Sequence, residues 1–287
     1  SATTNLSWIY MTEPLFTIDH VSFAYPGRPA SLEDVSFSIR PGERVALLGA
    51  NGSGKTTLLH MLDGLYFPTA GTITALGQPL TEAVVETPPF GPRFRKEVGF
   101  LFQNSDAQLF CATVEEELAF TPLQLRWPQE EIRRRTEDVL ALLEITHLRE
   151  RPPQTMSAGE QKRVALASLL MMSPSVLLLD EPTGGLDPRS QSVLLEILHE
   201  LHHGGVTLIT ATHDLTILPH LADRALVLNE AHRLAADAPA EEILENVDLL
   251  LEVNLIHAHS HQHGRLVHSH PHHHIVAHEH QHEHKDV

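Results

Sequence analysis

Cysteine, positive charge and long apolar runs are all scarce in this sequence. Cys111 is the single cysteine, so an internal disulfide cannot form, which fits a reducing cytosol. Lysine and arginine number 20 against 37 aspartates and glutamates, giving a net charge of −17. A nucleic-acid-binding module normally carries a basic stripe, so this balance argues against nucleic acid as a partner. No apolar run approaches the roughly 18 residues that a transmembrane helix needs.

The start of the chain lacks the features of a targeting segment. Residues 1–10 have neither the basic start nor the apolar core of a signal peptide. We expect the natural chain to begin near Met11 and residues 1–13 to be a disordered extension. The length of 287 residues allows one large domain or two small ones, with an ample core.

A glycine-rich segment, GANGSGKTT at 49–57, follows the apolar run 45–48 and opens an apolar helix. It fills the template G-x-x-x-x-G-K-[ST]. In this context the backbone N–H groups and the helix N-terminus form a cradle for phosphate. Lys55 is predicted to reach the β- and γ-phosphates, and the Thr56 hydroxyl to bind Mg²⁺. The predicted nucleotide-binding residues of this segment are Gly49, Asn51, Gly52, Ser53, Gly54, Lys55, Thr56 and Thr57.

Further motifs follow in a fixed order. Ser157-Ala158-Gly159-Glu160 heads a helical pattern, with Ser157 placed as the N-cap. The short apolar strand 176–179 ends in Asp180-Glu181. A carboxylate at that position is a partner for Mg²⁺, and the adjacent glutamate can polarise an attacking water. After the segment 183–187 and another helix, the strand 206–210 leads to His213.

This order of motifs resembles the ATP-binding cassette (ABC) family from about residue 15 to residue 245. The resemblance implies an α/β fold: a P-loop NTPase core with an antiparallel β subdomain and an inserted helical subdomain. We expect the ATPase domain at 14–245, its helical subdomain at about 104–160, and a C-terminal extension at 246–287. Alternating apolar residues over 15–45 favour antiparallel strands. Further strands are predicted at 45–48, 98–102, 175–180, 206–211 and 224–228, and the proline-rich segment 81–95 is predicted as a surface loop.

The resemblance also implies roles for single residues. Tyr25 would stack on adenine, and Gln103 would contact Mg²⁺ and the attacking water. Glu181 would be the general base, and His213 would contact the γ-phosphate. From the residues alone, Tyr25 could instead be a partly buried strand-end tyrosine, Gln103 a capping residue and His213 a structural histidine.

The resemblance further implies a dimer. In this family the segment containing Ser157 and Gly159 lies across from the P-loop of a second copy, so that each ATP is sandwiched between two subunits. Asp187 would reach across the same interface. The usual pattern has a glycine where this chain has Ala158, and we expect the added methyl group to weaken activity without abolishing it.

The segment QNSDAQLF at 103–110, followed by TVEEELAF at 113–120, resembles the ATPases of energy-coupling-factor importers. In that group this region receives coupling helices from a transmembrane partner. From the residues alone, the run could be a charged helix face with Phe110, Leu118 and Phe120 in the core.

Histidine dominates the end of the chain: 13 of the 31 residues from His257 onward are histidine, largely in the pattern H-x-H. An extended chain places such i, i+2 imidazoles on one side, and neutral imidazole suits Ni²⁺, Co²⁺, Cu²⁺ and Zn²⁺. The alternative is a solvated, disordered tail without a metal. The candidate Ni²⁺ or Co²⁺ ligands are His257, His259, His261, His263, His268, His270, His278 and His280.

We therefore predict an ATPase on the cytoplasmic face of the membrane that uses ATP and Mg²⁺ to power import of Co²⁺ or Ni²⁺. The expected partners are a second copy of the chain, a transmembrane coupling subunit and a substrate-binding membrane subunit. Alternatives in the same class are the ATPase of a zinc, manganese or vitamin importer. A non-transport ABC ATPase typically needs long coiled coils or two cassettes, and a metal-storage protein would need neither the segment at Ser157 nor His213.

Overall fold

The computed structural model describes residues 13–263 and 266–272. The N-terminal extension predicted at 1–13 lies outside the described residues except for its last position. Two predicted tail ligands, His278 and His280, also lie outside them. None of the described helices is long and apolar enough to cross a membrane.

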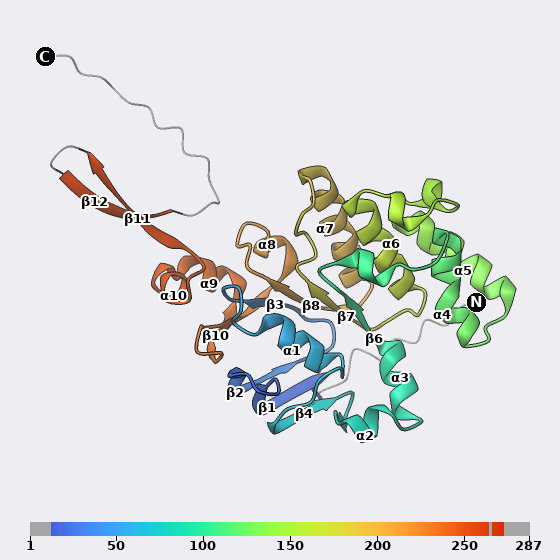
Figure 1. The fold of residues 1–287 in the computed structure, drawn as a ribbon, viewed down its shortest axis with the longest axis horizontal. Helices are drawn as coiled ribbons and strands as arrows, with labels where there is room; N and C mark the ends of the chain where they lie inside the picture. The colour runs from blue at the N-terminus through green and yellow to red at the C-terminus, as the bar shows by residue number, and fades with distance from the viewer. Residues whose placement is uncertain (1–12, 264–265, 273–287) are drawn as a thin grey trace, which may run out of the picture.

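A six-stranded sheet in the order β10-β9-β3-β8-β7-β6 forms the centre of the molecule (Figure 1). All neighbouring pairs are parallel except β9 with β10. The parallel strands are buried on both faces and are therefore largely apolar, as in β7, where all five residues are buried. The strands are β3 (Arg44–Leu48), β6 (Val98–Leu101), β7 (Val176–Asp180), β8 (Thr207–Thr212), β9 (Arg224–Leu228) and β10 (Leu234–Pro239).

The register brings three carboxyl ends to the same edge of this sheet. Leu48 at the end of β3 pairs with Thr212 at the end of β8, and Asp180 at the end of β7 pairs with Ala211. The segments that follow these strands therefore begin side by side.

A second, antiparallel sheet has the order β2-β1-β4-β5. Its apolar face shares a core with helix α1 (Lys55–Leu62) and with Val45 and Leu47 of β3. Strands β4, β5 and β10 are absent from the pattern-based prediction. The strands are β1 (Phe16–Ala24), β2 (Ala30–Ile39), β4 (Ala70–Ala75) and β5 (Gln78–Pro79).

The helices pack into the two cores on either side of the central sheet. In Figure 1, α4 and α5 lie together beside α6 as a helical subdomain. The longer helices are α1 (Lys55–Leu62), α4 (Val114–Gln124), α5 (Gln129–Leu142), α6 (Ala158–Leu170) and α7 (Pro188–His203). The shorter ones are η2 (Ser105–Gln108), η3 (Thr146–Leu148), η4 (Pro153–Thr155), α8 (Leu218–Leu221), α9 (Ala240–Glu245) and α10 (Val247–Glu252).

The prediction of a loop over 81–95 is wrong in part, because this segment contains α2 (Glu82–Val85) and most of α3 (Phe90–Glu97). The Thr81 side chain caps α2. Pro92 falls in the first turn of α3, where the missing N–H group would have no intrahelical partner anyway. Phe94 is buried and holds α3 against the core.

The large core continues past α9 to Leu250, Val253 and Ile256. After Ile256 the backbone enters β11 (His257–His263), which pairs with β12 (Leu266–His272) in a separate two-stranded antiparallel sheet. Figure 1 shows this hairpin extending away from the body of the molecule.

We expect a chain that ends after Ile256 to unfold at the same urea concentration as the full chain. A chain that ends after Asn254 should lose about 1.5–3 kcal/mol of unfolding free energy, because the side chain of Ile256, only 6% exposed, is then missing from the core. Urea unfolding followed by circular dichroism measures both midpoints. An equal loss in the two truncated chains would show that the hairpin stabilises the core.

Candidate active site

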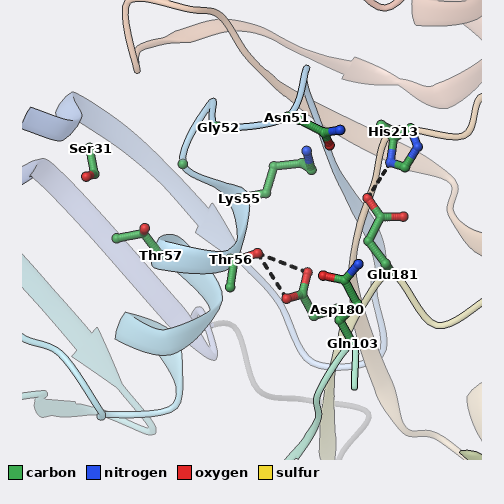
Figure 2. A pocket seen from close by; sticks show the side chains of 11 residues that line it. Ser31, Asn51, Gly52, Lys55, Thr56, Thr57, Gln103, Asp180, Glu181 and His213 are labelled. Atoms are coloured by element: carbon green, nitrogen blue, oxygen red, sulfur yellow. Dashed lines mark hydrogen bonds and ion pairs between the residues drawn. The ribbon is translucent and has the colours of Figure 1, made fainter. Parts of the chain in front are cut away.

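A cleft of about 340 Å³ opens at the edge of the central sheet where β3, β7 and β8 end (Figure 2). Its walls come from the P-loop, the end of β7, and the segments after β6 and β8. The lining residues are Ser31, Asn51, Gly52, Gly54, Lys55, Thr56, Thr57, Gln103, Asp180, Glu181 and His213. The fold thus brings together residues that are far apart in sequence, up to the 182 positions between Ser31 and His213.

The P-loop wraps tightly around the start of α1. Gly54 is the N-cap of this helix and has a φ of 109°, a conformation that L side chains rarely adopt. A Cβ atom at Gly54 would also collide with the Ser31 carbonyl oxygen. The loop therefore requires glycine here, and the N-terminal N–H groups of α1 are left for an anion. Gly49 and Ser53 belong to the same loop without lining the cleft.

Lys55 is buried, and its Nζ donates to the carbonyl oxygens of Gly49 at 2.8 Å and Ala50 at 3.2 Å. An ammonium group has three donors, so one remains for a ligand. Burial lowers the pKa of Lys55, while the charges of Glu181 and Asp180 oppose that shift. A bound phosphate would add a further favourable charge and would complete the donor set.

Thr56 and Asp180 are in direct contact: Thr56 Oγ1 donates to Asp180 Oδ2 at 2.9 Å and lies 3.2 Å from Oδ1. Burial raises the pKa of Asp180, and the hydrogen bond from Thr56 opposes that shift. Figure 2 shows Gln103 beside Asp180 in the same cleft. A hydroxyl, a carboxylate and an amide oxygen are hard ligands of the kind that Mg²⁺ prefers, so these residues fit that ion.

Glu181 is held from both sides. His213 Nδ1 lies 2.6 Å from Glu181 Oε1, and Thr212 Oγ1 donates to Oε2 at 3.1 Å. The backbone of Glu181 has a φ of 44°, and Lys162 Nζ donates to its carbonyl oxygen at 3.1 Å. The carboxylate of Glu181 therefore has a fixed position in the same cleft as Lys55, where a phosphate group would bind.

Three of these residues, Ser31, Lys162 and Thr212, are not among those predicted from the sequence. Lys162 has a recognisable signal in the sequence, because it is spaced four and eight residues from the apolar Leu166 and Leu170 in the predicted helix. Thr212 directly precedes His213 and could have been included by adjacency. Ser31 carries no local signal, since only tertiary structure brings β2 to the P-loop.

Tyr25 lies beside the cleft and does not line it. Its hydroxyl is 3.2 Å from Thr57 Oγ1, and its ring packs edge-on against Phe23 and Tyr66. Tyr66 is 38% exposed, so the cluster of Phe23, Tyr25 and Tyr66 presents an aromatic surface next to the P-loop helix. Stacking of Tyr25 on adenine stays a prediction.

Ser157 and Gly159 do not line the cleft either. Ser157 is exposed and caps α6 through a reciprocal pair of hydrogen bonds with Glu160. A Cβ atom at Gly159 would approach the Ser190 hydroxyl to 2.7 Å, so this glycine lets α6 and α7 pack closely. Asp187 caps α7 and accepts from the Ser190 hydroxyl at 2.6 Å.

Comparison with known proteins agrees with this geometry. The family model for "ABC transporter" matches residues 32–184. The nickel import ATP-binding protein NikO of Rhodobacter capsulatus is 49% identical over 246 residues, covering 85% of this chain and 96% of that protein.

Two solved structures are also similar. CbiO1 of Clostridium perfringens, described as part of the ABC transporter complex cbiONQ, has a TM-score of 0.74 and 33% identity, covering 85% of this chain and 95% of that one. The dimeric cassette MJ0796 bound to ADP and phosphate has a TM-score of 0.69 and 25% identity, covering 78% of this chain and 98% of that one. These findings confirm the predicted α/β P-loop fold. The chain belongs to the ABC transporter family, as an ATPase that binds ATP and Mg²⁺.

Proposed function

We propose that this chain is the ATP-hydrolysing subunit of a nickel or cobalt importer of the energy-coupling-factor type, bound to the cytoplasmic face of the membrane. The observation that carries the catalytic part is the fixed Glu181 carboxylate facing Lys55, Thr56 and Asp180 in one cleft. The transport part is supported by the similarity to a nickel import protein and by the histidine-rich end of the chain.

The hydrogen bonds around Glu181 suit a general base. Each carboxylate oxygen accepts one hydrogen bond, from His213 or Thr212, and keeps a lone pair for water. Glu181 takes the proton of the attacking water, and His213 keeps the carboxylate oriented. Lys55 holds the phosphates against the P-loop N–H groups, while Thr56, Asp180 and Gln103 would hold Mg²⁺, which supplies positive charge to the phosphate oxygens when bound.

Glu181→Gln should leave ATP binding intact, because the amide keeps the shape of the side chain. It should lower turnover by about 10²–10⁴-fold, since the amide cannot accept the proton. Phosphate release and nucleotide binding measure the two effects, with Glu196→Gln on the exposed face of α7 as the control. Retention of more than about a tenth of the turnover would remove Glu181 from the role of general base.

A composite site between two copies explains why Ser157 and Gly159 stand apart from the cleft. Both belong to the N-terminal end of α6, where Ser157 is exposed and only locally bonded. A similar cassette is a dimer in its solved structure. We infer that each P-loop is completed by Ser157 and Gly159 of a second copy.

Mixing two inactive variants tests this arrangement. A Lys55→Ala chain lacks a working P-loop, and a Ser157→Arg chain blocks the exposed end of α6. Each homodimer should be inactive, whereas the mixed dimer has one intact composite site and should recover part of the activity. ATPase assays on each chain and on the mixture measure this. Full turnover by a chain that sedimentation shows to be monomeric would contradict the composite site.

A second hollow, of about 290 Å³, fits a transmembrane coupling subunit. Its walls include Phe100, Phe102 and Gln108, and burial raises the pKa of Asp63 on the same wall to about 7, with Arg95 opposing that shift. Gln108 belongs to the segment 103–110 that resembles coupling-factor ATPases, and its side chain lines this hollow. It accepts a hydrogen bond from the Phe102 N–H group and donates one to the Phe100 carbonyl oxygen.

The exposed aromatics of that segment support the same assignment. Phe110 is 62% exposed and Phe120 is 40% exposed, and their rings pack edge-on 4.8 Å apart. Only Leu118 of the three apolar residues considered for the core is buried there. Aromatic residues are enriched at protein interfaces, so this exposed pair supports a site of protein contact.

The backbone of the histidine-rich end supports metal binding. The register of β11 and β12 sets His257 opposite His272, His259 opposite His270, and His261 opposite His268. Residues alternate between the faces of a strand, so these positions share one face, and directly opposed Cβ atoms lie about 4.5–5.5 Å apart. The backbone register thus places histidine positions opposite one another, which supports a metal-binding role for this segment.

We expect the chain that ends after Ile256 to lose most of the Ni²⁺ and Co²⁺ ions that the full chain binds, while ATPase activity stays unchanged. Binding to the full chain should weaken as the pH falls below about 6.5, because protonated imidazole cannot ligate a metal. Calorimetric titration of both chains above and below this pH measures the effect. If the two chains bind an equal number of ions, the histidine-rich tail does not bind metal.

A further inference from the structure

A pair of histidines on α7 has its ring nitrogens turned toward each other. His199 and His203 are four residues apart, which places them on the same helix face. Both are exposed, their ring centroids are 4.2 Å apart, and the two Nε2 atoms are separated by 2.8 Å. This pair lies in the ATPase domain and is used neither by the active site nor by the C-terminal hairpin.

The separation of the two nitrogens suits chelation. In the contact as it stands, one ring must donate a proton to the lone pair of the other. A divalent ion in place of that proton would use both lone pairs. With metal–nitrogen bonds of about 2.0–2.1 Å, ligands at 90° are about 2.8–3.0 Å apart and tetrahedral ligands about 3.3 Å apart. The observed 2.8 Å fits the 90° arrangement of square-planar and octahedral ions.

We propose that His199 and His203 form a surface chelate for a divalent transition-metal ion such as Ni²⁺. No cluster of three or more His, Cys, Asp or Glu side chains suited to a metal is present in the described part of the chain, so water completes the coordination. Two exposed carboxylates lie near the pair in the helix sequence: Glu196 is three residues before His199, and Glu200 is three residues before His203.

The position at the end of α7 favours a cation. His203 is the last residue of the helix, where the carbonyl groups give the negative end of the helix dipole. His202 does not belong to the chelate, because it is half-buried and, as the neighbour of His203 in sequence, points about 100° away from it around the helix axis. Pro188 at the opposite end of α7 is 11 residues before His199, or about 17 Å along the helix axis, so an ion here does not contact the nucleotide cleft.

The test uses the chain that ends after Ile256, because this chain keeps every core residue described for the domain and lacks the tail histidines. NiCl₂ is titrated by calorimetry above the imidazole pKa of about 6.5 into this parent chain and into His199→Ala, His203→Ala and His147→Ala. His147 is an exposed histidine in η3 with no imidazole contact in the described structure, so it controls for the loss of one imidazole. We expect the parent chain to bind one ion. Each α7 variant should bind Ni²⁺ at least about tenfold more weakly, and the control should bind it as tightly as the parent.

The full chain gives a second readout. An ion held by two residues of a folded helix raises the unfolding temperature, because the unfolded chain does not hold the pair together. The Ni²⁺-dependent rise should shrink in full-length His203→Ala and persist in full-length His147→Ala, with ATPase activity in Mg²⁺ and without Ni²⁺ equal in both. The inference is overturned if the parent chain binds no Ni²⁺. It also fails if His203→Ala binds Ni²⁺ as tightly as the parent, or if His147→Ala weakens binding as much. None of these outcomes bears on the proposed transport function.

Discussion

The parallel register of β3, β8 and β7 is the constraint on which the site depends. Because Leu48 pairs with Thr212 and Asp180 with Ala211, the P-loop, the acidic pair and His213 all start from one edge of the sheet. These strands are buried on both faces, and a shift by one residue would turn every side chain to the opposite face. The packing of the core and the geometry of the cleft are therefore specified by the same set of strand pairs.

Charges within the cleft are arranged before any ligand arrives. Lys55 and Lys162 are both buried, and burial lowers the pKa of each, while Asp180 and Glu181 oppose that shift. Burial raises the pKa of Asp180 in the same way. The charged form of each of these three side chains is therefore unfavourable unless an opposite charge lies close by. Enzymes use such preorganised charges to stabilise the charge that develops during a reaction. Phosphate near Lys55 and Mg²⁺ near Asp180 would supply the missing partners.

Strands that are buried on both faces can be predicted from sequence because they are largely apolar, and all five predicted core strands lie within two residues of the observed ones. Strand β4 escapes prediction because its first three residues are exposed, and β10 because no residue in it is buried. Helices α2 and α3 escape because proline-rich sequence is typical of loops, whereas a proline in a first turn costs no helical hydrogen bond.

The candidate site is predictable to the extent that its residues are adjacent in motifs. Lys55, Thr56, Asp180, Glu181 and His213 meet in the cleft as their motifs predict. The contacts that hold Glu181 in place could not be predicted in this way. Lys162 reaches it from 19 positions away, and no spacing rule links a helix lysine to a strand-end carbonyl.

The contact between Lys162 and Glu181 also links the proposed dimer interface to the general base of the same copy. Ser157 caps the N-terminus of α6 and in the dimer would lie against the nucleotide of the second copy. Lys162, five residues later, bonds the Glu181 carbonyl of its own copy. Gly159 meanwhile packs α6 closely against Ser190 of α7. A displacement of the N-terminal end of α6 therefore changes the support of Glu181 directly. One helix would then carry information about the neighbouring nucleotide to the general base, which gives a physical reason for the two ATP sites to act together.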